Sequence, residues 1–150
     1  MSLISVLELN NATPERDDIR KALEASEDQF LAQQQQAMKP QLLFAASWVA
    51  KNVQEPVILM GWAASGYRLL GAPVLGMFIL TSERLVFVRT DNSKGTEEVV
   101  EYNRSDITKP TKAGMFGLKK VQFQHKGQAH TLHRIHRSNA DAIVNELTKQ

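Results

Sequence analysis

The first third of the chain carries apolar residues at helical spacing. Within residues 10–38, Ile19, Leu23 and Phe30 recur at intervals of four and seven residues, which is the pattern of an amphipathic helix. Thr13 comes directly before a proline and a run of acidic residues, and threonine is a good N-cap at such a position. The sequence therefore predicts a helix over residues 10–38.

A second helix is predicted over residues 41–53, separated from the first at Pro40 because the residue before a proline disfavours helical backbone. This segment is apolar around most of its circumference, so it must be buried on more than one side. It packs either against the rest of the chain or against another subunit. For the second alternative, the candidate oligomer contacts are Leu43, Phe44 and Trp48.

From Pro56 onward the pattern changes to short β-branched and aromatic runs separated by turn residues, which is typical of antiparallel strands. Seven strands are predicted, at residues 57–63, 74–81, 84–90, 97–102, around Ile107, 117–124 and 129–134. A final amphipathic helix is predicted over residues 139–149, with Ser138 as its N-cap and Asp141 in the capping-box position.

The third predicted strand is apolar at four consecutive positions, residues 85–88. Strands with one exposed face alternate between apolar and polar residues, so this strand needs cover on both faces. The apolar helix over residues 41–53 is the available cover, which places the N-terminal helices on the outside of the sheet. Thr81 and Arg84 flank the preceding turn, where a hydroxyl can bond a backbone donor and an arginine can pair across strands.

Residues 56–82 carry a single charge, Arg68, and could be mistaken for a membrane span. Four glycines and two prolines divide this stretch into pieces shorter than a span. Two strands with a glycine-rich loop over residues 64–72 explain it better. Trp62 and Tyr67 beside Arg68 then form a candidate contact site, because an aromatic body next to a cation suits a membrane interface or protein recognition. The alternative is that Trp62 ends a buried strand.

Composition narrows the class of protein. The chain has 150 residues, 43% of them hydrophobic and 23% charged, as expected of a globular unit with one core. It has no cysteine, which excludes disulfides, thiolate nucleophiles and cysteine-ligated zinc and fits a reducing compartment. The N-terminus lacks the basic start of a secretory signal, so a cytoplasmic protein is expected.

The net charge of +2 hides an asymmetry. Residues 1–55 carry a net charge of −3 and residues 56–150 one of +5, and residues 104–137 alone carry +7. Opposite signs on the two parts favour docking of one on the other, or on a neighbouring copy.

The basic segment could meet lipid head groups, nucleic-acid phosphates or an acidic protein surface. The alternative interpretation is that these basic side chains are only solvated surface residues and bind no partner. A nucleic-acid platform needs aromatic residues for stacking, and only Phe116 and Phe123 fall in this segment, which argues against nucleic acid. The candidate binding residues of the segment are Lys109, Lys112, Lys119 and Lys120.

No chemistry-bearing motif emerges. All four histidines fall between residues 125 and 136, but strand alternation directs His130 and His136 to one side and His133 to the other. Ser65 and Ser82 have no histidine or aspartate in a recognisable arrangement. We therefore expect no metal, no cofactor and no enzymatic activity.

The strand order also carries a family resemblance. The run GMFILTSERLVF at residues 76–87 resembles the central strand pair of bacterial pleckstrin-homology-like (PH-like) and YokE-like domains, and residues 100–108 resemble a later strand entry of that group. The resemblance covers residues 55–149. It implies an α+β fold in which a PH-like split barrel of about seven antiparallel strands (residues 55–150) is capped by a C-terminal helix. The helical region at residues 1–54 has no counterpart in it.

PH-like domains are generally binding or scaffold modules, and many bacterial members form oligomers. The members that bind phosphoinositides carry several basic residues in the first loop between strands, where this sequence has only Arg68. The resemblance therefore implies a non-catalytic interaction module, a homo-oligomer that binds a protein partner. Peripheral binding to anionic membrane lipids, and nucleic-acid binding by residues 104–137, are the alternatives.

Overall fold

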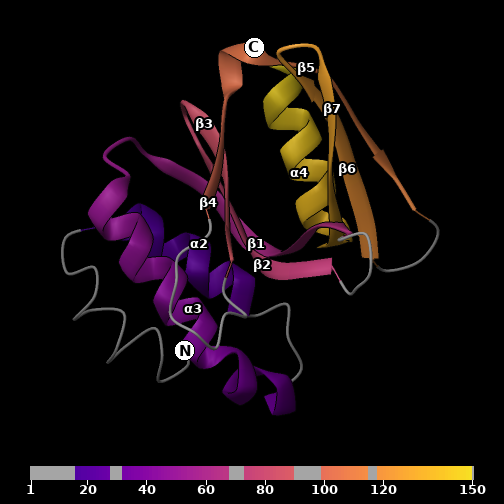
Figure 1. The fold of residues 1–150 in the computed structure, drawn as a ribbon. Coiled ribbons are helices and arrows are strands. Elements are labelled where there is room, and N and C mark those ends of the chain that lie inside the picture. Colours follow the sequence, from indigo (N-terminus) through magenta and orange to yellow (C-terminus); the bar gives the residue numbers. More distant parts are fainter. Residues whose placement is uncertain (1–15, 28–31, 68–72, 90–98, 115–117, 150) are drawn as a thin grey trace.

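The structure is a computed structural model that describes residues 16–27, 32–67, 73–89, 99–114 and 118–149 (Figure 1). Its elements in chain order are α2 (Asp17–Glu27), α3 (Ala32–Asn52), β1 (Val57–Tyr67), β2 (Pro73–Thr81), β3 (Arg84–Arg89), β4 (Val99–Asn103), the short 3-10 helix η2 (Arg104–Asp106), β5 (Ile107–Ala113), β6 (Leu118–His125), β7 (Gln128–His136) and α4 (Arg137–Thr148).

All seven strands belong to one antiparallel sheet in the order β4-β3-β2-β1-β7-β6-β5. The sheet is not closed, because β4 and β5 are its two edges. Figure 1 shows it curving around α4, while α2 and α3 lie together on the other face. The prediction of an α+β fold with seven antiparallel strands and a C-terminal helix is confirmed. None of the helices within the described residues combines the length and apolar character that crossing a membrane requires.

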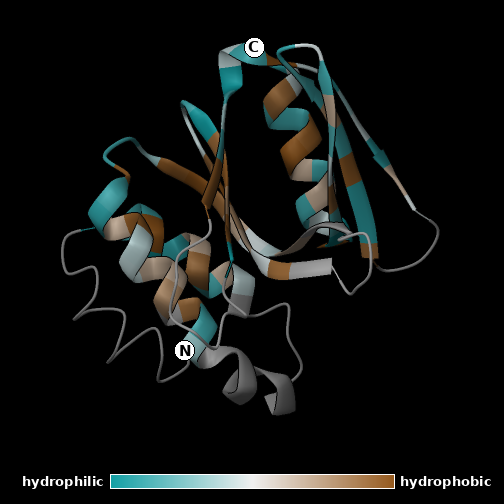
Figure 2. Ribbon diagram, viewed as in Figure 1, coloured by the Kyte–Doolittle hydropathy of each residue, from teal (hydrophilic) through white to brown (hydrophobic). Residues whose placement is uncertain are grey.

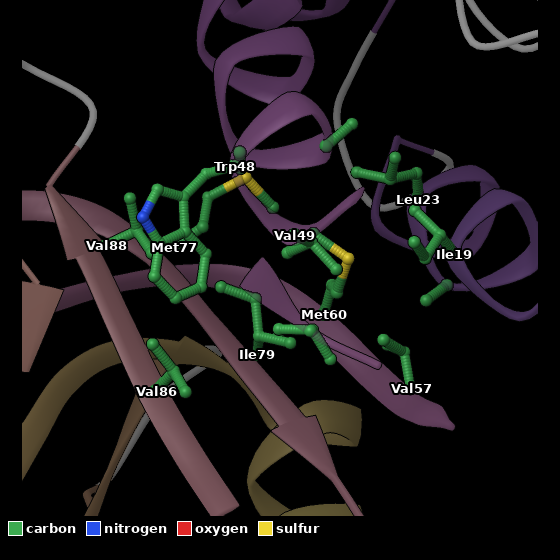
Figure 3. Close-up of a cluster of buried hydrophobic side chains, with 14 of the residues drawn as sticks. Ile19, Leu23, Trp48, Val49, Val57, Met60, Met77, Ile79, Val86 and Val88 are labelled. Carbon is green, nitrogen blue, oxygen red and sulfur yellow. The ribbon is translucent and has the colours of Figure 1, made fainter. Parts of the chain in front are cut away.

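Two apolar clusters occupy the two faces of the sheet. Val86 and Val88 of β3 point to the cluster formed with α2 and α3 (Figure 3). Leu85 and Phe87 point to the second cluster, which contains the hydrophobic side of α4 (Figure 2). The prediction that residues 85–88 are covered on both faces, with the helix over residues 41–53 outside, is confirmed. The helices and the sheet therefore share a core.

The predicted boundary between the two N-terminal helices is wrong. The first helix ends at Glu27, and α3 begins at Ala32 and continues through Pro40. A proline inside a helix removes one hydrogen bond and costs about 3 kcal/mol. The helix tolerates this cost because the turns after Pro40 bury apolar residues such as Ala45 and Val49 against the sheet. The predicted N-cap Thr13 lies outside the described residues.

The predicted cap of the C-terminal helix is also displaced. The N-cap is His136, whose Nδ1 accepts a hydrogen bond of 3.2 Å from the backbone N–H of Ser138. Ser138 lies inside the first turn instead of capping it, since α4 begins at Arg137. Imidazole offers the same kind of acceptor as a serine hydroxyl, which is why α4 starts earlier than the serine and aspartate pattern predicts.

The link between α3 and β1 is held on one side by α2. Arg16 donates to Asp18 at 2.8 Å and to the backbone oxygen of Val53, also at 2.8 Å. Asp18 in turn accepts the backbone N–H of Val57 at 2.7 Å. The hydrogen bond from Arg16 is the main reason that the pKa of Asp18 falls to about 2. These contacts fix where the helical region joins the sheet.

The turn between β2 and β3 holds the same link from the other side. The Thr81 hydroxyl accepts the backbone N–H groups of Glu83 and Arg84 and donates to Glu55 at 2.9 Å. Arg84 donates to Glu55 at 2.7 Å and pairs with Glu101 on β4. Both roles predicted for Thr81 and Arg84 are confirmed. Burial alone raises the pKa of Glu55, but the hydrogen bonds from Arg84 and Thr81 outweigh it and lower that pKa to about 2.

Replacing Trp48 tests the shared core. Trp48 is only 7% exposed in the cluster between α3 and the sheet, so Trp48→Ala is expected to lower the free energy of unfolding by about 3–5 kcal/mol. Phe44 on the same helix is 36% exposed, and Phe44→Ala is the matched control with an expected cost below about 1 kcal/mol. Urea denaturation of the full chain measures both. Equal small losses would contradict the packing of α3 on its own sheet.

Acid should weaken the link around Glu55 and Asp18. Both folded pKa values are about 2, below the ordinary values of 4.5 and 3.8, so their contribution is present above pH 5 and is lost as the pH falls toward 2. Between pH 7 and pH 3 the loss from Glu55 amounts to about 2 kcal/mol, because the rest of it falls below pH 3. Unfolding free energies between pH 7 and pH 3 measure it. Glu55→Gln should flatten this dependence and exposed Glu83→Gln should not; equal slopes in the two variants would refute the assignment.

Candidate functional site

A pocket of about 240 Å³ opens where the ends of β5 and β6 meet the start of α4. Its lining is predominantly cationic and comes from three elements: Lys112, Ala113, Gly114, Lys119, Arg137 and Asp141. We call this the cationic pocket. The strands β6 and β5 stand at one end of the strand order, whereas α2 and α3 pack on β1, β2 and β3. Figure 1 shows β5 and β6 away from α2 and α3.

The strand registers explain why two lysines reach the pocket. Lys112 of β5 lies opposite the buried Val121, and Lys119 of β6 lies opposite the buried Ile135. Residues directly opposite each other share a face of the sheet, so both lysines are on the face that carries α4. Their positions near the strand ends leave the ammonium groups at the rim of the core, where polar groups can reach solvent.

Each cation is held differently. The Lys112 ammonium contacts the Asp141 carboxylate, and Lys119 donates to the backbone oxygen of Gly114 at 2.7 Å. The guanidinium of Arg137, the first residue of α4, donates no hydrogen bond to the residues that the structure describes, and its charge contributes to the lowered pKa of Asp141. One of the three cations is therefore paired, one is anchored to backbone and one is available for a ligand.

Asp141 is the single acidic group of the pocket lining. Its pKa lies below the usual value, first because Lys112 donates a hydrogen bond to it and further because of the positive charges of Arg137 and Lys119. Three positive charges against one negative charge leave an excess of two. An anion entering the pocket replaces water around these groups and offsets that excess.

The neighbouring lysine of the predicted set points the other way. Lys120 lies opposite Ala113, on the face of β6 that carries neither Val121 nor α4. There it approaches His133 and Arg134: burial first, then the charges of Lys120 and Arg134, lower the pKa of His133. The basic segment therefore presents two groups of charge, the cationic pocket and an outer group formed by Lys120, His133 and Arg134.

Lys109, the remaining predicted lysine, is exposed on β5 and is not part of the pocket lining. It has a φ of 52° at the irregularity between Thr108 and Thr111. Non-glycine residues are uncommon in this left-handed region. The bulge turns this edge strand aside and interrupts its regular pairing.

The contact site expected around Trp62 is not at a loop tip. The strand β1 continues to Tyr67 and pairs with β2 as far as Pro73, so the expected loop over residues 64–72 is wrong for its first four residues. Trp62 lies within β1 and packs, partly buried, against the cluster formed with α2 and α3. The Tyr67 side chain and Arg68 lie outside the described residues.

The three candidate oligomer contacts on α3 differ in their exposure. Trp48 is buried in the chain's own core and Phe44 is 36% exposed, while the side chain of Leu43 lies outside the described residues. The apolar circumference of α3 is thus largely satisfied within the chain.

Two arginines of the basic segment have different roles from each other. Arg104 is buried and donates to the backbone oxygens of Thr81 at 2.9 Å and Glu146 at 2.8 Å, so it joins the β2–β3 turn to the end of α4. Arg137 was not among the predicted binding residues, although it lines the pocket. Its position one residue after the last strand is the signal that could have placed it beside the β5–β6 hairpin.

Two of the four histidines lie in a cluster of rings. The rings of His125 and His130 are 6.2 Å apart, both lie beside Tyr102, and His130 also stacks on Phe123. This cluster joins the edge strand β4 to β6 and β7. Within the described ranges, no three potential metal ligands converge. Phe123 belongs to the core and offers no stacking surface, and Phe116 lies outside the described residues.

Opposite charge accounts for only part of the docking of the two regions, through the ion pair between Glu55 and Arg84. The helices α2 and α3 reach the sheet through apolar side chains, and the ion pairs at their junction involve Arg16 and Arg84, which precede the basic segment. Among the described residues, the basic segment has its own acidic partners in Asp106, Asp141 and Glu146.

No protein-family model and no curated protein matches the sequence. The arrangement itself can bind anions, since it combines concentrated positive charge with donors that are not fully used.

Proposed function

We propose that this protein is a non-catalytic interaction module, a PH-like split barrel that binds an acidic protein partner. The observation that carries the proposal is the convergence of Lys112, Lys119 and Arg137 from three elements on one pocket. Single exposed lysines are ordinary on a protein surface. Three cations around one hollow concentrate the potential where a carboxylate or phosphate group can enter.

The strand order supports the barrel. Seven antiparallel strands followed by a helix that packs inside the curve of the sheet are what the resemblance to PH-like domains implies. The cluster of the N-terminal helices involves β1, β2 and β3, whereas α4 covers β5 and β6 on the other face of the sheet. The cationic pocket opens at the ends of β5 and β6 beside the start of α4, and this end of the sheet is available for a partner.

Anionic membrane lipid is the second candidate. Leu118, which precedes Lys119 and Lys120, is 57% exposed, and an apolar side chain beside cations suits the interface of a negatively charged bilayer. Vesicle sedimentation distinguishes the two candidates, because a membrane-binding protein is retained by phosphatidylglycerol vesicles at low salt and a binder of acidic protein is not.

Charge removal in the pocket tests the main proposal. Lys119→Gln combined with Arg137→Gln should weaken binding to poly-L-glutamate about tenfold at low salt, which corresponds to about 1.4 kcal/mol. The matched control removes two charges from exposed positions on α2 and α3, Lys21→Gln with Lys51→Gln, and should change binding less than twofold. Calorimetric titration measures both affinities. Equal effects of the two double variants, or no binding by the native chain, would count against a partner-binding pocket.

Self-association belongs to the same proposal. The strand β4 is a free edge of the open sheet, and Val100 on it is 42% exposed. Such edges pair with strands of other molecules. Light scattering on the full chain is expected to give a mass above the 16.8 kDa of one chain. A single mass of 16.8 kDa at high concentration would contradict it.

A further inference from the structure

The cationic pocket has the charge of a site for one small dianion. Lys112, Lys119 and Arg137 supply three positive charges and Asp141 removes one, which leaves an excess of two. A carboxylate carries one negative charge, and a phosphate monoester near neutral pH carries close to two. The monoester therefore matches the pocket more closely.

The donors also approach from different directions. An ammonium has three N–H donors and a guanidinium has five. Lys119 uses one donor on the backbone oxygen of Gly114, Lys112 uses one on Asp141, and Arg137 uses none on the described residues. These groups line the same pocket from β5, β6 and α4, so a ligand with several oxygens has more than one donor available to it. A phosphate monoester offers three terminal oxygens, whereas a planar carboxylate offers two.

Asp141 limits the positive charge that the pocket presents to a ligand. Its carboxylate contacts Lys112 and is also subject to the charges of Lys119 and Arg137. An incoming anion must compete with Asp141 for Lys112 and is repelled by it. The repulsion by Asp141 and the attraction by the three cations both grow with the charge of the ligand, and because the cations are in excess, the net attraction is larger for a dianion than for a monoanion.

We propose that the cationic pocket binds a phosphate monoester in its dianionic form, with Arg137 and Lys119 as the main donors. The inference rests on the part of the proposed function that assigns anion binding to this pocket, because it specifies which anion the pocket selects. A soluble phosphate monoester and a lipid head group that ends in one share this chemistry.

The first experiment compares glycerol 3-phosphate with dimethyl phosphate, a diester with one negative charge, by calorimetric titration of the full chain at constant ionic strength. The monoester should bind at least tenfold more tightly. Arg137→Gln and Lys119→Gln should each weaken it about tenfold, and Lys109→Gln, a lysine of β5 outside the pocket, should change it less than twofold. Circular dichroism confirms that each variant is folded.

The second experiment separates the two sources with vesicles of equal surface charge. Preferential sedimentation with phosphatidate, a monoester, over phosphatidylglycerol, a diester, supports a lipid source. Binding of glycerol 3-phosphate without such a preference supports a soluble one. Equal affinity for glycerol 3-phosphate and dimethyl phosphate would overturn the inference. If poly-L-glutamate still binds in a manner that depends on the pocket, the proposed function survives that result; if it does not, both fail.

Discussion

Burial of both faces of β3 is the constraint on which the rest of the structure depends. Four consecutive apolar residues cannot be covered by a single layer, because neighbouring side chains of a strand point to opposite sides. The helix α4 covers Leu85 and Phe87, and α2 with α3 covers Val86 and Val88. The helices bury their apolar side chains only against the sheet, and β3 is buried on both faces only when α4 lies on one face and α2 with α3 on the other. The N-terminal helices are therefore part of the core and not an appendage, even though the resemblance to PH-like domains begins only after them.

Polar contacts fix the position of the outer layer. The short link between α3 and β1 receives Arg16 and Asp18 from one side and Thr81 and Arg84 from the other. Buried apolar surface has little directionality, whereas these hydrogen bonds specify a single register between helix and sheet. Because two arginines and two carboxylates serve this junction, the stabilising charges lie near β1 and β3. The charged residues that line the cationic pocket take no part in this junction.

Much of the fold was predictable from the sequence, and the reasons are local. The strands have β-branched residues and turn signals, and the two-faced burial of residues 85–88 follows from four adjacent apolar positions. The boundary at Pro40 was not predictable, because burial of the following turns outweighs the local preference. The lysines of the pocket were identified by type, but their division between two faces depends on the register of β5 with β6. The inclusion of Arg137 depends on where α4 meets that hairpin. The strand register and the position of α4 both depend on contacts between residues far apart in the sequence, so a local sequence pattern does not predict them.

In the proposed function, β1, β2 and β3 bury the N-terminal helices, and the ends of β5 and β6 beside α4 bind an anion. Amide chemical shifts of the isotope-labelled full chain during titration with inorganic phosphate test this proposal directly, because they report on every part of the sheet at once. The account predicts the largest changes at residues 112–114, Lys119 and residues 137–141, with little change in α2, α3 or β3. Changes centred on α3 and β3, or small changes spread evenly over all exposed lysines and arginines, would contradict it.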